Sequence, residues 1–169
     1  KLYDFCRTVD NIADQESSLE YKKKELKKFR ANFENKDFKN EVIKNMWELI
    51  DEFNISKKVV CDLLDGIESD IKEKVKIKNE KELLIYSYRV AGTVGLMMAK
   101  IFNIKKKESL QRAIYLGIAM QLTNIARDVI EDEKKNRVYL INYTEDTLIN
   151  IKKIIYTADT FYNSSFVGI

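Results

Sequence analysis

The sequence predicts an all-α protein with a single domain, and three observations support that prediction. Apolar residues recur at helical spacing along most of the chain, whereas the alternation typical of strands is hard to find. The 169 residues include no proline and only 5 glycines, so turn signals are sparse and long helices are favoured. With 45% hydrophobic residues, a chain of this length has enough apolar material for one core.

Seven helices are predicted in order, separated by segments rich in Asn and Lys. The segments NFENKD, KIKNE, FNIKKKE and EDEKKNR interrupt the apolar periodicity, and each is read as a break. The predicted helices span residues 1–15, 18–34, 38–53, 55–75, 79–103, 107–133 and 145–165. No internal repeat and no low-complexity linker is visible, which agrees with one domain.

The composition excludes several classes of function. The chain has no histidine, which removes Ser-His-Asp, Cys-His and histidine-ligated metal chemistry. A net charge of +3 gives little support to nucleic-acid binding. Cys6 and Cys61 form no CxxC pair, so a reducing cytosol is the default compartment. Lysines cluster at 22–28 and 105–107; we expect them to be solvated, with attraction to an anionic membrane left open.

The first segment, YDFCRTVDNIAD, places polar side chains on one side of a helix. Tyr3, Arg7, Asp10 and Asp14 follow one another at intervals of three or four residues, within an arc of roughly 60°. The two carboxylates would repel each other, and Arg7 would offset part of that repulsion. Alone, this pattern favours an exposed charged face.

A second acidic segment, QLTNIARDVIED, repeats the carboxylate spacing. Its core-facing stripe is predicted to contain Leu122, Ile125, Ala126, Val129 and Ile130. Its other stripe contains Gln121, Asn124, Arg127, Asp128 and Asp132, and continues upstream through Gly117, Ala113 or Ile114, and Leu110. A face that is apolar at one end and acidic at the other suits a cavity that holds an amphiphile.

Paired aspartates on two helices indicate magnesium and diphosphate chemistry. Mg²⁺ prefers oxygen ligands and bridges readily to substrate phosphates, so carboxylates could hold an anionic head group through the metal. Metal and arginine charges would then stabilise a departing diphosphate. An apolar pocket would shield the resulting carbocation from water, and tyrosine rings could stabilise it by cation–π contact.

The segment LLIYSYRVAGTVGLMMAKIF has small residues in the middle of a helix. Glycine there costs about 0.5–1 kcal/mol relative to alanine, so Gly92 and Gly95 need a reason. Either another helix or a ligand approaches closely, and both alternatives stay open. Met97 and Met98 are expected to fill the core.

At these residues the chain resembles the squalene/phytoene synthase family, the head-to-head branch of the trans-prenyl diphosphate synthases. YDFCRTVDNIAD is similar to the family's first aspartate-rich motif, and QLTNIARDVIEDEKKNRVYL is similar to the second. YSYRVAGTVGLMMAKIF, LLDGIESDI and ADTFYNSSFVGI resemble other helices of the family. The resemblance implies part of the isoprenoid synthase helical bundle with a central active-site cavity, in which residues 1–169 form one domain that is incomplete at both ends.

The resemblance also implies roles for individual residues. The implied Mg²⁺ ligands are Asp10, Asp14, Asn124, Asp128 and Asp132. The implied contacts to diphosphate and substrate are Tyr3, Arg7, Gln121, Asn124, Arg127 and Arg137. Tyr86 would lie near the reacting carbons as a catalytic residue beside the four aspartates, and Ala91, Val94 and Gly95 would line the cavity.

The implied activity is that of a prenyltransferase in isoprenoid biosynthesis. The segments RVAGTVGLMM and LGIAMQLTNIARDV are most similar to those of bacterial phytoene synthases. Those enzymes join two molecules of geranylgeranyl diphosphate through a cyclopropyl diphosphate intermediate in carotenoid biosynthesis. The implied cofactor is Mg²⁺, with Mn²⁺ as a substitute, and NADPH is implied only for a squalene-forming enzyme. We expect a cytoplasmic protein with no nucleic-acid partner; contact with the inner face of the membrane and the oligomeric state are open.

Departures from the family pattern keep alternatives open. Asn11 replaces the second residue of a common Asp-Asp pair, Asn136 replaces a frequent Gly, and Leu140–Ile141 replaces Leu-Pro. The first alternative is a squalene or dehydrosqualene synthase that uses farnesyl diphosphate, and the second is a catalytically silent relative that acts as a scaffold. A head-to-tail synthase would need DDxxD, which DNIAD preserves only in part, and a generic helical interaction module would not explain the tapered stripe.

Overall fold

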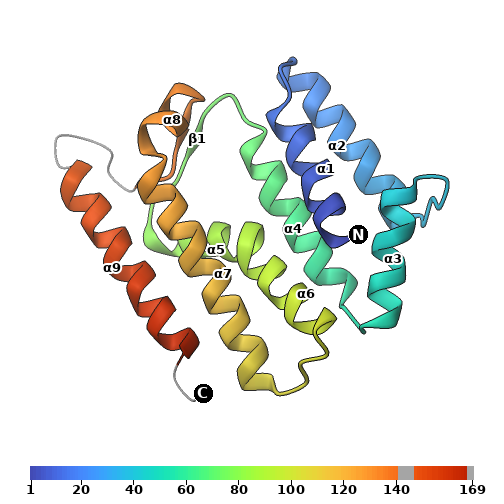
Figure 1. Cartoon of the computed structure of the whole chain (residues 1–169). Coiled ribbons are helices and arrows are strands. Elements are labelled where there is room, and N and C mark those ends of the chain that lie inside the picture. Colours follow the sequence, from blue (N-terminus) through green and yellow to red (C-terminus); the bar gives the residue numbers. More distant parts are fainter. Residues whose placement is uncertain (141–146, 167–169) are drawn as a thin grey trace. The chain divides into compact units, whose positions relative to one another are not determined.

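The computed structural model describes residues 1–140 and 147–166, and helices make up most of them (Figure 1). The all-α prediction is therefore confirmed. The chain divides into two compact units, Lys1–Glu73 and Lys74–Ile169. None of the described helices is long and apolar enough to cross a bilayer.

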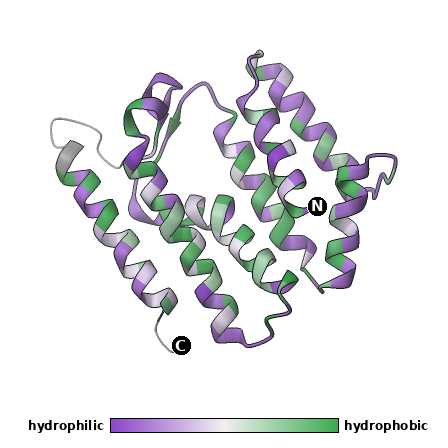
Figure 2. Ribbon diagram, viewed as in Figure 1, coloured by the Kyte–Doolittle hydropathy of each residue, from purple (hydrophilic) through white to green (hydrophobic). Residues whose placement is uncertain are grey.

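The first unit contains four helices. They are α1 (Leu2–Asp14), α2 (Leu19–Glu34), α3 (Glu41–Glu52) and α4 (Lys57–Asp70). Polar residues cap three of them: Ser18, Asn40 and Ser56 each accept a hydrogen bond from a backbone N–H in the first turn. The sequence thus marks where these helices begin. Between its buried positions, α2 is mostly hydrophilic (Figure 2).

Aromatic side chains form the centre of the first unit. The ring of Phe5 in α1 lies 5.5 Å from that of Phe29 and 5.7 Å from that of Phe33, both in α2. Phe33 also stacks on Trp47 of α3 at 5.3 Å, and the Trp47 indole N–H donates a 2.9 Å hydrogen bond to the Phe33 carbonyl. The indole is therefore buried with its polar group satisfied.

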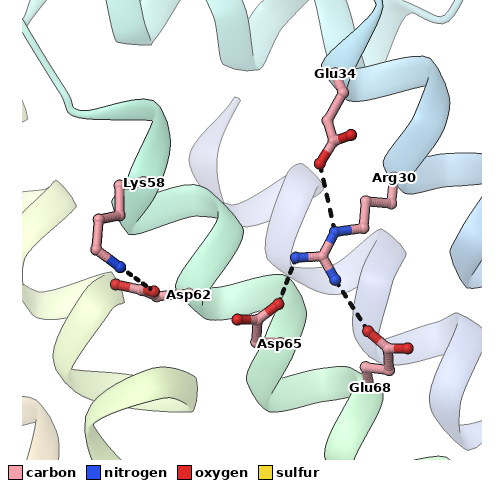
Figure 3. A network of polar contacts seen from close by, with 6 residues as sticks. All are labelled: Arg30, Glu34, Lys58, Asp62, Asp65 and Glu68. Atoms are coloured by element: carbon pink, nitrogen blue, oxygen red, sulfur yellow. Dashed lines mark hydrogen bonds and ion pairs between the residues drawn. The ribbon is translucent and has the colours of Figure 1, made fainter.

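An ion-pair network joins α2 to α4 in the same unit (Figure 3). The guanidinium of Arg30 contacts Glu34 at 3.5 Å in its own helix, and contacts Asp65 and, at 2.9 Å, Glu68 in α4. Burial opposes the charge, but the hydrogen bond to Asp65 and the two α4 carboxylates outweigh it and raise the pKa of Arg30. A shared cation thus holds the two helices together.

The second unit is arranged around one long helix. Its elements are β1 (Val75–Lys76), α5 (Glu80–Ser87), the π-helical segment η1 (Tyr88–Gly92), α6 (Thr93–Ile101), α7 (Lys107–Arg127), α8 (Val129–Lys134), β2 (Arg137–Val138) and α9 (Thr147–Phe166). Helix α7 packs against both α6 and α9 (Figure 1). The strands β1 and β2 pair in parallel, with Val75 opposite Arg137. This pairing brings Tyr139 and Leu140 into the core.

The glycines of α6 and α7 allow α7 to approach α6 and η1 closely. A Cβ atom on Gly95 would lie 2.2 Å from the Ala113 carbonyl oxygen, and one on Gly117 would lie 2.4 Å from the Ala91 carbonyl oxygen. Both contacts are with backbone, which cannot rotate away as a side chain can. Close helix packing therefore accounts for Gly95.

Most predicted breaks are observed, and asparagine marks them. Asn103 and Asn136 have positive φ angles of 59° and 57° at helix ends, and Lys36 has one of 54°. Asparagine tolerates this left-handed conformation better than most residues. Asn79, in the KIKNE segment, instead caps α5 through its side chain.

Two of the predicted helices end earlier than expected, and a third is confirmed with one irregularity. The helix predicted over 55–75 ends at Asp70, because residues 75–76 pair with β2 as a strand. The helix predicted over 79–103 is observed as α5, η1 and α6 without a gap, with π-helical geometry in η1. The helix predicted over 107–133 is interrupted at Asp128, whose φ and ψ are −99° and 14°. Residues 145–146 of the last predicted helix, and Ile141, lie outside the described residues.

The interruption at Asp128 also corrects the predicted core stripe. Leu122 and Ile125 are buried as predicted, whereas Ile130 is 71% exposed. A continuous helix would keep Ile130 on the buried face. Because α7 ends and α8 begins here, the residues after Asp128 no longer follow the α7 face.

Candidate active site

A groove of about 860 Å³ runs along α6 and α7 in the second unit. Its wall is mostly apolar and includes Val90, Ala91, Val94, Gly95, Met98, Ala99, Phe102, Ile104, Ala113, Leu116, Gly117 and Met120; the polar or charged members are Ser109, Arg112, Gln121, Asn124 and Ser165. Its size falls within the range of small-molecule pockets. Because Gly95 and Gly117 have no side chains, they allow close helix packing, and they also form part of the groove wall.

The groove has two chemically different ends. Gln121 and Asn124 contribute amide groups near the end of α7, whereas Phe102 and Ile104 contribute apolar side chains near its start. The α7 lining from Ser109 to Asn124 extends over about 22 Å at 1.5 Å per residue. A ligand with a polar head and a long apolar tail matches this arrangement.

The structure places the predicted cavity residues in this wall. Ala91, Val94 and Gly95 line the groove from η1 and α6, and Gln121 and Asn124 line it from α7. Of the two upstream residues left open, Ala113 faces the groove and Ile114 packs on the core. The contact of these residues with substrate stays a prediction.

The second acidic motif follows directly after the groove. The guanidinium of Arg127 donates two hydrogen bonds of 2.6 Å to the two carboxylate oxygens of Asp128. This hydrogen bonding lowers the pKa of Asp128. Asp132 and Arg137 lie around a separate, very small pocket beside α8 and β2. Neither Asp128 nor Asp132 is among the residues that line the groove.

The first acidic motif lies in the other unit, on the outer side of α1. Tyr3, Arg7 and Asp14 are exposed, and Asp10 is half-buried. Burial raises the pKa of Asp10, the charge of Asp14 raises it further, and Arg7 counteracts both. The expected repulsion between the two carboxylates, and its relief by Arg7, are thus present within α1.

Tyr86 lies in the core of the second unit. It is buried, its ring stacks on Tyr139 at 4.8 Å, and the two hydroxyl groups are 3.1 Å apart. It is not part of the groove wall described above. Its proposed position near the reacting carbons stays a prediction.

Much of the apolar end of the groove was not predicted from the sequence. Met97 fills the core as expected, but Met98 lines the groove and is partly exposed. Phe102, Leu116 and Met120 were not singled out either. The signal was present, since Val94, Met98 and Phe102 follow one another at four-residue intervals on one helix face.

The carboxylate and amide side chains present could hold Mg²⁺ only together with oxygen atoms of a substrate. Within the described ranges, 1–140 and 147–166, no cluster of three or more His, Cys, Asp or Glu side chains could hold a metal by itself. Magnesium is usually bound by one or two carboxylates together with substrate phosphates and water. Aspartate pairs with a neighbouring amide suit that mode of binding.

A helical unit whose mostly apolar groove ends at two amide side chains has the form of a binding site for an amphiphilic ligand. Comparison with known proteins identifies the class more closely: the squalene/phytoene synthase model matches residues 1–141. The chain belongs to the squalene/phytoene synthase family, whose members are prenyltransferases of head-to-head condensation and typically use Mg²⁺.

Relatives with different products are similarly close to this chain. It is 34% identical over 151 residues to the phytoene synthase of Pseudescherichia vulneris, covering 82% of this chain and 48% of the relative. It is 30% identical over 142 residues to the presqualene diphosphate synthase of Sinorhizobium fredii, covering 83% and 51%. The chain thus spans about half the length of these relatives.

A solved structure confirms the helical bundle of the family. A dehydrosqualene synthase in complex with ligand superposes with a TM-score of 0.80 at 26% identity, covering 98% of this chain and 64% of that one. The squalene synthase HpnC from Alicyclobacillus acidocaldarius superposes with a TM-score of 0.77 at 17% identity, which supports the fold alone.

Proposed function

We propose that this protein condenses two prenyl diphosphates head to head, with geranylgeranyl diphosphate as substrate and phytoene as product. The observation that carries the proposal is the groove along α6 and α7, which is apolar over most of its length and ends at Gln121 and Asn124. Asp128 follows one turn after Asn124. This order suits a prenyl tail in the groove and a diphosphate beyond its end.

A prenyl tail that fills the groove would displace water from its apolar wall. The wall offers few polar groups along α6, so a carbocation formed there would meet mainly apolar side chains. The amides of Gln121 and Asn124 would orient the head group, and Arg127 and Arg137 would supply positive charge to the diphosphate.

We assign both aspartate pairs, Asp10 with Asp14 and Asp128 with Asp132, to Mg²⁺, together with Asn124. Bound Mg²⁺ would neutralise charge on the leaving diphosphate. Because Arg127 holds both oxygens of Asp128, this guanidinium would have to move from the carboxylate to the diphosphate when the metal binds. Tyr3 and Arg7, exposed on α1, would add further contacts to diphosphate.

Phytoene formation would need no reductant. Two molecules of geranylgeranyl diphosphate yield phytoene when two diphosphates and two protons leave, by way of a cyclopropyl diphosphate. A squalene-forming enzyme would need NADPH as hydride donor. This difference gives a direct test of the reaction class.

A second candidate is the condensation of farnesyl diphosphate to presqualene diphosphate, squalene or dehydrosqualene. Relatives named for presqualene diphosphate and for phytoene synthesis have similar identity to this chain, and the matching solved structure is named a dehydrosqualene synthase. Sequence similarity therefore does not separate the two candidates. We favour phytoene because the segments RVAGTVGLMM and LGIAMQLTNIARDV are most similar to those of bacterial phytoene synthases.

The test is incubation of the protein with farnesyl or geranylgeranyl diphosphate and Mg²⁺ or Mn²⁺, with and without NADPH. Mass spectrometry of the extracted lipid identifies the product. We expect phytoene from geranylgeranyl diphosphate without NADPH, and no product from Asp128→Asn. A product from farnesyl diphosphate alone would establish the second candidate.

A silent relative would give a different result. It would bind geranylgeranyl diphosphate with equal affinity in Mg²⁺ and in EDTA, and it would release no diphosphate. We further propose that residues 1–169 act as one domain and that the protein works in the cytoplasm, at the inner face of the membrane that receives its apolar product.

A further inference from the structure

The loop between α6 and α7 forms the apolar end of the groove and is exposed. Phe102 is 68% exposed and Ile104 is 38% exposed, and Asn103 between them adopts a left-handed conformation that turns the chain sharply. Met98 and Leu116, also in the groove wall, are more than one third exposed. We call Met98, Phe102, Ile104 and Leu116 the loop patch. Exposed apolar side chains that gather at one end of a groove are candidates for an interaction surface.

Cations surround the loop patch. Lys105, Lys106 and Lys107 follow Ile104 directly and are exposed, Lys100 precedes Phe102, and Arg112 lines the same end of the groove. From residue 94 to residue 112 the only carboxylate in the sequence is Glu108. This end of the second unit therefore combines exposed apolar side chains with a clear excess of positive charge.

This chemistry fits an anionic lipid surface better than a protein partner. Lysine is depleted in protein–protein interfaces, whereas clustered lysines beside exposed apolar residues are typical of segments that bind anionic membranes. Phenylalanine and isoleucine side chains can enter the region between head groups and acyl chains while lysines contact lipid phosphates.

We infer that the α6–α7 loop docks this protein on the surface of an anionic bilayer, with Phe102 and Ile104 inserted and Lys105–Lys107 facing the lipid phosphates. Docking by this loop places the apolar end of the groove at the bilayer and leaves the Gln121–Asn124 end about 22 Å away along α7. An apolar molecule could then pass between groove and bilayer without crossing water.

The test is cosedimentation of the whole chain with vesicles, without substrate or metal. One set of vesicles contains equal parts of phosphatidylcholine and phosphatidylglycerol, and the other contains phosphatidylcholine alone. We expect binding to the anionic vesicles to fall roughly tenfold or more in K105Q/K106Q/K107Q, because each lysine near an anionic surface contributes about fivefold. We also expect a roughly tenfold loss in F102S/I104S, and weaker binding of the unaltered chain in high salt.

A matched control uses the other lysine cluster. K23Q/K24Q/K27Q removes the same charge from exposed positions of α2, and its binding should stay within about twofold of the unaltered chain. Equal losses in both triple variants would show general charge attraction and overturn the assignment to the loop. So would undiminished binding of F102S/I104S, or binding that does not depend on phosphatidylglycerol.

Two further measurements keep the result decisive. Circular dichroism should show unchanged helix content, since Phe102 and Ile104 are exposed; if the double variant loses helix, F102S alone replaces it. Light scattering measures the oligomeric state of the unaltered chain and of F102S/I104S. Dissociation of an oligomer without loss of vesicle binding would show that a second copy covers the patch and would overturn the lipid assignment. Because the assay needs no turnover, its failure is distinguishable from failure of the proposed reaction.

Discussion

Replacing Gly95 by alanine tests the close contact between α6 and α7. The added Cβ would lie 2.2 Å from the Ala113 carbonyl oxygen, whereas ordinary contacts of this kind begin at 3.4 Å. The two helices must therefore separate by roughly 1.2 Å at this crossing. Because the obstacle is backbone, no change of rotamer can relieve it.

The expected cost follows from two opposing effects. Overpacking a well-packed site costs about 1–3 kcal/mol, and a clash with backbone belongs at the upper end of that range. Alanine recovers about 1 kcal/mol of helix propensity relative to glycine. We therefore expect a net loss of about 2 kcal/mol, which lowers the Tm of a chain of this size by about 4–8 °C.

The assay is thermal unfolding followed by far-ultraviolet circular dichroism, with Gly92→Ala as the matched control. A Cβ on Gly92 meets side-chain atoms of Tyr88 at 3.1 Å and Ile114 at 3.2 Å, and these can shift. We expect the Tm of the control to stay within about 3 °C of the unaltered protein. A Tm of Gly95→Ala equal to that of the unaltered protein would refute the backbone contact.

Three other predictions concern charged and thiol groups. Burial and the charge of Asp10 raise the pKa of Cys6 to about 12, so its alkylation by iodoacetamide at neutral pH should be about a thousandfold slower than that of a free thiol, as measured by peptide mass spectrometry. Arg30→Gln should destabilise the first unit by about 1–2 kcal/mol, seen as a lower urea midpoint. Arg127→Gln should raise the pKa of Asp128 toward its ordinary value, as measured by carbon NMR titration, because the hydrogen bonds that lower it are lost.

Each of these predictions has a matched control. Cys61→Ser leaves Cys6 as the only thiol, and rapid alkylation of that variant would contradict the raised pKa of Cys6. Lys58→Gln removes a far more exposed ion-pair cation from α4, so a midpoint shift as large as that of Arg30→Gln would contradict the special role of the network. At pH values above the ordinary pKa of aspartate, the Arg127–Asp128 ion pair should stabilise the fold. This stabilisation should be lost as the pH falls through the lowered pKa of Asp128. An Asp128 titration unchanged in Arg127→Gln would exclude the pair.

The order of the helices could be predicted from the sequence because its signals are local. Capping by Ser18, Asn40, Ser56 and Asn79, and the left-handed turn at Asn103, depend on residues only a few positions apart. That Ala91, Val94 and Gly95 line a cavity was predicted through the resemblance to the family. Their place beside α7 is a tertiary contact.

Non-local features could not be predicted in this way. The two-residue strands β1 and β2 pair positions more than sixty residues apart, and neither strand has enough length to show alternation. The interruption at Asp128 was not predicted, because the apolar residues keep their helical spacing on both sides of it. Only the structure shows that Ile130 leaves the buried face. The apolar end of the groove was missed because Met98 and Phe102 look like core residues until their neighbours are known.

The sequence by itself determined that the protein is helical, where most of its helices begin, and, through two aspartate motifs, which family it resembles. These properties depend on short-range periodicity, capping and ordered motifs. The tertiary structure alone decided that Gly95 and Gly117 meet backbone, that α6 and α7 enclose a groove with one apolar and one polar end, and that Tyr86 packs on Tyr139. Such facts depend on which helix faces pack together, and packing is set by long-range burial that no single segment encodes.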